Sequence, residues 1–123
     1  MHYDPSVAPN AAAWLAKDEG ERLELVRRYH RRQRIKLPNL DAHAVAHAAI
    51  ENQLAEGLVP ATRALTRLLA EGLDRHEAIH ALGSVLMVHL WNLTENPNGD
   101  GDPNSAYLAA LDRLTAASWR ASG

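Results

Sequence analysis

The 123-residue sequence predicts an all-α protein, an antiparallel helical bundle of four to five helices. Leu, Ala and Val must form the core, because aromatic residues make up only 5% of the chain and Phe is absent. An Ala- and Leu-rich chain with few β-branched residues favours helices. Apolar residues recur at helical spacing between capping and breaking residues, and no stretch alternates as a half-buried strand does.

The elements are expected to follow one another with short connections. Residues 1–9, which carry two prolines, predict an extended lead-in. A short helix is expected over 11–17 and longer helices over 18–34, 41–56, 60–72, 74–94 and 105–120. Each begins at a residue that favours a helix start, namely Asn10, Asp18, Asn39 or Asp41, Pro60, Asp74, and Asn104 or Ser105. Gly57, Gly72 and the segments 37–39 and 95–103 end them.

Length and composition exclude several classes of protein. We expect one domain over residues 1–123, long enough to bury a core without disulfides or a structural metal. The absence of cysteine excludes thiolate metal sites and Cys nucleophiles. No apolar run approaches the roughly 20 residues that span a bilayer, and no signal peptide is evident, so we expect a cytoplasmic protein without membrane contact.

Two histidines share one face of the helix expected over 41–56. His43, His47 and Glu51 follow one another at intervals of four residues. Successive members of such a series lie about 40° apart on the helix. Ile50 and Leu54 fall on the same side, so this pattern places the imidazoles on the apolar face.

The helix expected over 74–94 carries a second pair in the sequence H-E-x-x-H. His76 and His80 lie one turn apart and border an apolar stripe that includes Ile79 and Gly83, whereas Glu77 lies on the flank. Gly83 would allow another helix to approach closely at this point.

These two pairs predict a metal site between the helices. Imidazoles one turn apart can bind the same cation. A single buried histidine is usually a hydrogen-bonded core residue, but four without a common partner would cost roughly 1–3 kcal/mol for each unsatisfied group. We therefore expect His43, His47, His76 and His80 to bind a divalent transition metal such as Zn, Fe, Mn or Ni, with Glu51 as fifth ligand or bridge.

The predicted function is that of a metal-binding bundle, with several readings open. The first is a small metalloenzyme, hydrolytic or oxidative, that acts on a small-molecule substrate with Glu77 as a ligand or acid/base group. A zinc peptidase is a weaker reading, since no sheet edge is expected to hold a peptide. The alternative is a non-catalytic metal- or partner-binding bundle, and a homo-oligomer could complete the site.

Three further features have ordinary structural readings. Residues 27–36 hold six of the thirteen basic residues, but the net charge of −2 and the helix dipole disfavour nucleic-acid binding. The acidic loop 98–102 lacks the glutamate of a calcium loop and is expected to be a turn. His89 lies away from His76 and His80 on its helix.

The order of these residues resembles a bacterial all-helical family that is catalogued as a domain of unknown function. The resemblance covers residues 40 to 114 and depends on a series of motifs: His43-x3-His47-x3-Glu51-x-Gln53, Pro60, His76-Glu77-x-x-His80, Trp91 and Tyr107-Leu108. It implies that the two histidine blocks form one unit. The family often has an acidic residue just before the position of His89, where this chain has Val88.

Overall fold

The computed structural model describes residues 2–33, 40–96 and 101–122, and within these ranges it contains seven helices and no strand. The predicted all-α helical bundle is confirmed, but the described residues form seven helices rather than the four to five expected, in part because the last expected helix is divided in two. The helices are α1 (Ala11–Leu15), α2 (Glu19–Arg32), α3 (Leu40–Ala55), α4 (Val59–Ala70), α5 (Arg75–Glu95), α6 (Pro103–Arg113) and α7 (Ala116–Ala121).

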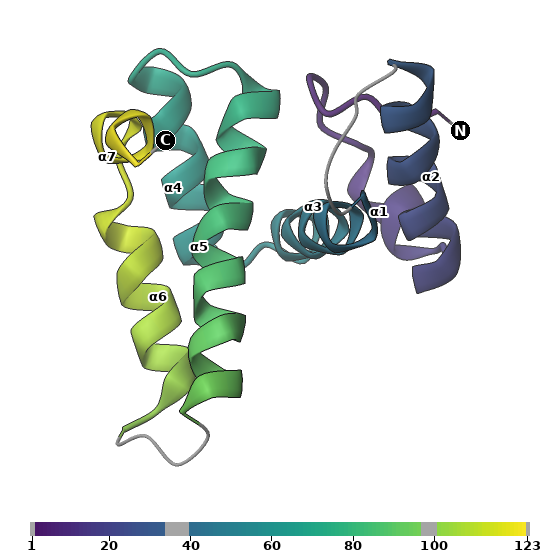
Figure 1. Cartoon of the computed structure of the whole chain (residues 1–123). Helices are drawn as coiled ribbons and strands as arrows, with labels where there is room; N and C mark the ends of the chain where they lie inside the picture. The colour runs from purple at the N-terminus through teal and green to yellow at the C-terminus, as the bar shows by residue number, and fades with distance from the viewer. Residues whose placement is uncertain (1, 34–39, 97–100, 123) are drawn as a thin grey trace.

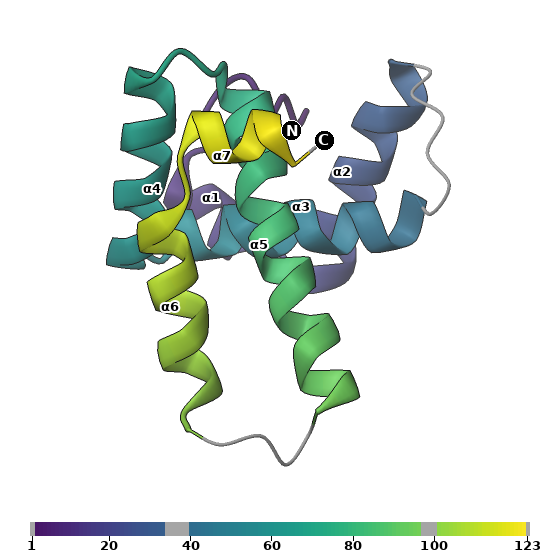
Figure 2. The same ribbon diagram turned by 60° about the vertical axis from the view of Figure 1, so that its left-hand side comes forward.

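Helix α3 lies in the middle of the molecule and separates two groups of helices. In Figure 1 it is seen nearly end-on, with α1 and α2 on one side and α4 to α7 on the other. Helices α4, α5 and α6 run alternately up and down beside one another, whereas α3 crosses behind α5 (Figure 2). The long helix α5 packs on α3, α4 and α6, and α2 packs on α3.

Each side of α3 has its own hydrophobic core. The larger core includes Ile50 of α3 with buried residues of α4 to α7, such as Leu68 and Leu82. The smaller core includes Ala44 and Ala48 of α3 with buried residues of the N-terminal segment, α1 and α2. Helix α3 therefore belongs to both cores, and its histidines lie where the two cores meet.

Small residues let α3 and α5 approach closely beside the histidines. A Cβ atom built on Gly83 of α5 would lie 3.6 Å from the Cβ atom of Ala46 in α3. Both residues are buried. Because the two helices approach closely here, the histidines of α3 lie next to those of α5.

The helix starts largely follow the predicted caps. The side chains of Asn10, Asp18 and Asp74 accept hydrogen bonds from backbone N–H groups of the first turn, at 3.0, 2.8 and 2.7 Å. For α6 the cap is Asp102 rather than Asn104 or Ser105, since Pro103 occupies the first helical position. The predicted turn at 98–102 lies mostly outside the described residues.

The last predicted helix, 105–120, is divided in two. It ends at Arg113, and Thr115 begins α7 in a capping box with Ser118. The guanidinium group of Arg67 donates to the carbonyl oxygens of Leu111 and Leu114 at 2.8 and 2.9 Å. These bonds satisfy carbonyl groups that the break removes from the helix, so packing against α4 overrides the local helix pattern.

In the part of the chain that the structure describes, no helix is long and apolar enough to cross a membrane.

Candidate metal centre

Five imidazole rings meet between α2, α3 and α5. His43 and His47 come from α3, His76 and His80 from α5, and His30 from α2. The ring centroids of His76 and His80 are 4.4 Å apart, and those of His43 and His80 are 4.7 Å apart. His30 lies 4.7 Å from His43 and 5.2 Å from His47. The structure thus brings together the two predicted pairs and adds a fifth ring.

Four of the rings present nitrogen atoms to a common point. One ligand atom from each of His30, His47, His76 and His80 lies within 4.8 Å of the others. Nitrogen ligands of a single tetrahedral zinc ion, at Zn–N distances of 2.0–2.1 Å, lie about 3.3 Å apart. Small side-chain rotations would therefore bring the four nitrogens onto one ion.

One ring nitrogen in each of the five histidines has no hydrogen-bond partner among the described residues. These nitrogens are the Nε2 atoms of His30, His43, His47, His76 and His80, and each is buried. A buried polar atom without a partner costs free energy. Because the five rings are neighbours, a shared ligand could satisfy several of these atoms together.

In two of the rings, a hydrogen bond at the Nδ1 atom determines which ring nitrogen carries the proton. The Nδ1 atom of His30 lies 2.8 Å from the carbonyl oxygen of Val26, which can only accept. The Nδ1 atom of His47 lies 2.9 Å from the hydroxyl of Tyr3, which donates its own proton to Glu51. Both Nδ1 atoms must therefore carry the hydrogen, which leaves the Nε2 lone pairs free to bind a cation.

The surroundings favour the neutral form of four of the imidazoles. Burial, together with the neighbouring imidazoles, lowers the pKa of His43 and His80 to about 4 and that of His47 to about 2. Burial also lowers the pKa of His76. A metal ion requires the neutral form, so these four imidazoles are in the form that could bind one at neutral pH.

Glu51 is placed behind the imidazoles and not among them. Its two carboxylate oxygens accept from the guanidinium of Arg75 at 2.7 and 2.9 Å. The hydroxyl of Tyr3 donates to one of these oxygens at 2.5 Å. Arg75, Glu51, Tyr3 and His47 thus form a chain of hydrogen bonds that ends at the cluster. The predicted role of Glu51 as fifth ligand or bridge remains a prediction.

Glu77 lies on the exposed side of α5. One of its carboxylate oxygens accepts a 3.3 Å hydrogen bond from the indole of Trp119 in α7. It is not part of the group of four converging ligands. Its predicted role as a ligand or acid/base group therefore has no support from this arrangement.

His30 is the member of the cluster that the sequence prediction omits. It lies four residues after Val26 on the apolar side of α2, and it is fully buried. A single histidine among arginines carries no pattern of its own. Its spacing from Val26 is the one signal that marks it as a buried residue.

Three of the four arginines that the structure describes in the basic segment form ion pairs, with two carboxylates between them. Arg28 and Arg31 pair with Glu24, and Arg27 pairs with Asp41. Arg34 and Lys36 lie outside the described residues. These pairs favour a structural role for the segment.

His89 stacks on Tyr107 at 4.9 Å, away from the cluster, as its helical position predicts.

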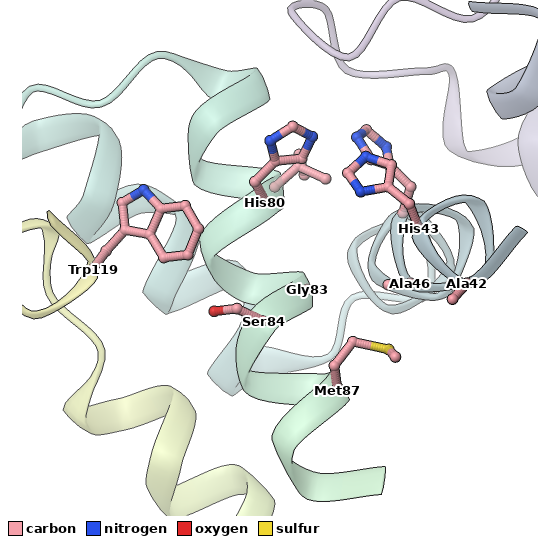
Figure 3. Close-up of a pocket in the computed structure, with 10 residues that line it drawn as sticks. Ala42, His43, Ala46, His80, Gly83, Ser84, Met87 and Trp119 are labelled. Atoms are coloured by element: carbon pink, nitrogen blue, oxygen red, sulfur yellow. The ribbon is translucent and has the colours of Figure 1, made fainter. Parts of the chain in front are cut away.

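A pocket of about 350 Å³ opens beside the cluster. One wall consists of the imidazoles of His43, His47 and His80. Figure 3 shows the rings of His80 and His43 facing each other between α5 and α3, with Trp119 and Met87 on the remaining sides. A small molecule could therefore reach an ion held by the cluster.

Comparison of the chain with models of protein families, with curated proteins and with solved structures finds no match. The resemblance to the helical family thus stays a prediction.

Proposed function

We propose that this protein binds one divalent transition-metal ion through His30, His47, His76 and His80. The observation that carries the proposal is the group of buried Nε2 atoms without a partner. Two of these atoms are fixed as lone-pair donors by bonds on the other side of the ring. An ion bound by these four histidines would satisfy four of the five atoms at once, whereas the Nε2 atom of His43 lies outside this ligand set.

The hydrogen-bond chain behind His47 supports the same proposal. Imidazole ligands of metals commonly donate their second N–H to a carbonyl or carboxylate, which orients the ring and raises its basicity. His30 donates directly to Val26, and His47 reaches Glu51 through Tyr3. We assign Glu51 to this supporting position.

The pocket favours a metal centre with an open coordination position over one whose coordination shell is filled by protein ligands. Four histidines complete the shell of a tetrahedral zinc ion. Iron, manganese and nickel accept further ligands, and the pocket approaches the cluster from the side of His43. We propose a small metalloenzyme, hydrolytic or oxidative, in which the ion would supply Lewis-acid or redox chemistry. A non-catalytic metal-binding bundle is the alternative.

Metal content tests the proposal directly. The protein, purified without metal-affinity chromatography, is stripped with a chelator, reloaded with Zn, Fe(II), Mn or Ni, and subjected to elemental analysis. We expect about one ion per chain. The variants His30→Ala and His76→Ala should lose most of the bound metal. His89→Ala, which removes an imidazole outside the cluster, is the matched control and should retain it.

Two results would contradict the proposal. One is a metal content far below one ion per chain with every metal tested. The other is an equal content in His30→Ala, His76→Ala and His89→Ala, which would place the metal elsewhere.

A further inference from the structure

The pocket beside the imidazole cluster has an apolar interior. Besides the three histidines, its walls include Ile79, Met87 and Trp119 together with small residues of α3 and α5. Its volume of about 350 Å³ lies in the range of pockets that bind small molecules. The body of a ligand in this pocket would therefore be hydrocarbon.

Polar groups in the pocket are few. None of its described lining residues is Asp, Glu, Lys or Arg. Ser84 donates its hydroxyl proton to the carbonyl oxygen of Ala81 at 2.7 Å. A charged group of the ligand would thus find its partner at the imidazole wall, where the metal is proposed to bind.

The charge of a bound ion would have little compensation from the protein. The imidazoles are neutral ligands, so a divalent ion keeps its charge of +2. Glu51, the carboxylate linked to the cluster through Tyr3, is already paired with Arg75. Asp4 and Asp74, whose charges act on His76, are both exposed. Burying a charge without a counter-charge is costly, so an anionic ligand would be favoured at the open side of the ion.

We propose that the pocket binds a small monocarboxylate with an apolar tail, and this inference rests on the proposed metal centre. The carboxylate binds the ion on the side of His43, and the hydrocarbon tail lies against Ile79, Met87 and Trp119. Charge selects the head of the ligand, and the apolar wall selects the tail. The ligand class is thus a hydrophobic monocarboxylate.

The test uses three probes that separate charge from hydrocarbon contact: hexanoate, acetate and hexanamide. Calorimetric titration of the metal-loaded protein should show hexanoate binding at least about tenfold more tightly than acetate, because burial of the additional methylene groups is favourable. Hexanoate should also bind at least about tenfold more tightly than the neutral hexanamide, because only the anion offsets the charge of the ion. The metal-free protein should bind hexanoate much more weakly.

A pair of neighbouring substitutions locates the ligand. Met87 lines the pocket, whereas Val88 does not and is 60% exposed. Met87→Trp should reduce the affinity for hexanoate about tenfold or more while leaving metal content and acetate binding unchanged. Val88→Trp is the matched control and should leave all three unchanged.

The possible failures are distinguishable. If no metal binds under any condition, the proposed function fails and this inference fails with it. If the loaded protein binds hexanoate no better than hexanamide, or no better than acetate, only the ligand assignment is overturned. Equal effects of Met87→Trp and Val88→Trp would likewise place the ligand outside this pocket.

Discussion

The Nδ1 atom of His47 lies 2.9 Å from the phenolic oxygen of Tyr3, a residue 44 positions earlier in the chain. Tyr3 is itself buried, and it contacts Glu51 on its other side. Burial, followed by the charge of Glu51, raises the pKa of Tyr3 well above its ordinary value. Tyr3 therefore stays protonated and donates a hydrogen bond to Glu51. Its oxygen is then free to accept a hydrogen bond from His47.

Replacing this hydroxyl should weaken metal binding without removing a ligand. We expect Tyr3→Phe to lower the affinity for the metal by about 10- to 100-fold, the usual effect of losing a partner behind a histidine ligand. Competition with a chromophoric chelator measures the change. Tyr107→Phe is the matched control, because the Tyr107 hydroxyl donates to Gln53 at 2.8 Å outside the cluster. Equal affinities of the two variants would show that Tyr3 does not act through His47.

Glu51→Gln distinguishes a supporting role for Glu51 from a ligand role. The substitution leaves the guanidinium of Arg75 without its charged partner, and breaking a buried ion pair in this way costs about 3–5 kcal/mol. We expect a loss of this order in the free energy of unfolding of the metal-free protein, measured in urea. The double variant Glu51→Gln/Arg75→Met should recover part of it. A Glu51→Gln variant that is stable without metal but fails to bind it would instead support the ligand role.

The metal-free protein should lose stability in mild acid. The pKa of His43 and His80 is about 4 in the folded protein, against an ordinary value of 6.5, because burial and the neighbouring imidazoles disfavour the charged form. Between these values the unfolded chain binds more protons than the folded one. The free energy of unfolding should therefore fall as the pH is lowered from about 6.5 to about 4, by about 1.4 kcal/mol per pH unit for each proton of difference.

Urea denaturation at a series of pH values measures this slope. The variant His43→Gln/His80→Gln should show a shallower dependence, since two of the titrating groups are gone. A slope that is the same in both proteins would assign the acid sensitivity to other groups.

Arg67 should be more important for stability than a neighbouring arginine of the same helix. Its guanidinium satisfies the carbonyl oxygens of Leu111 and Leu114 at the end of α6. We expect Arg67→Met to lower the free energy of unfolding by about 1–3 kcal/mol, the cost of leaving a partly buried acceptor without a partner. Arg63→Met, which breaks only the exposed pair with Asp112, should cost about 0–1 kcal/mol. Thermal unfolding compares them, and equal losses would contradict this role.

The sequence predicts the histidine faces of α3 and α5 well because these depend on local periodicity. The intervals of four residues between His43 and His47 and between His76 and His80 place each pair on one face in any helix. The apolar neighbours of each pair then indicate that the faces are buried. The structure accordingly brings both pairs together.

The remaining parts of the site depend on contacts between distant segments. Periodicity places Glu51 on the same face as the histidines, but it does not indicate that Arg75 and Tyr3 bind its carboxylate. His30 joins the cluster because α2 packs on α3, and a single histidine gives no local sign of this. The division between α6 and α7 likewise depends on Arg67, which precedes the break by more than forty residues.

Because α3 lies between two hydrophobic cores, an ion in the imidazole cluster would affect how firmly the two cores are held together. Helix α2 and helix α5 both pack on α3, and the cluster joins His30 of α2 to His76 and His80 of α5. An ion bound there would act as a cross-link between the two cores, and it would close a loop of about fifty residues in the same sense as a disulfide. In a chain without cysteine, the histidines thus provide the means of such a cross-link, and this one would be released by a chelator rather than by a reductant.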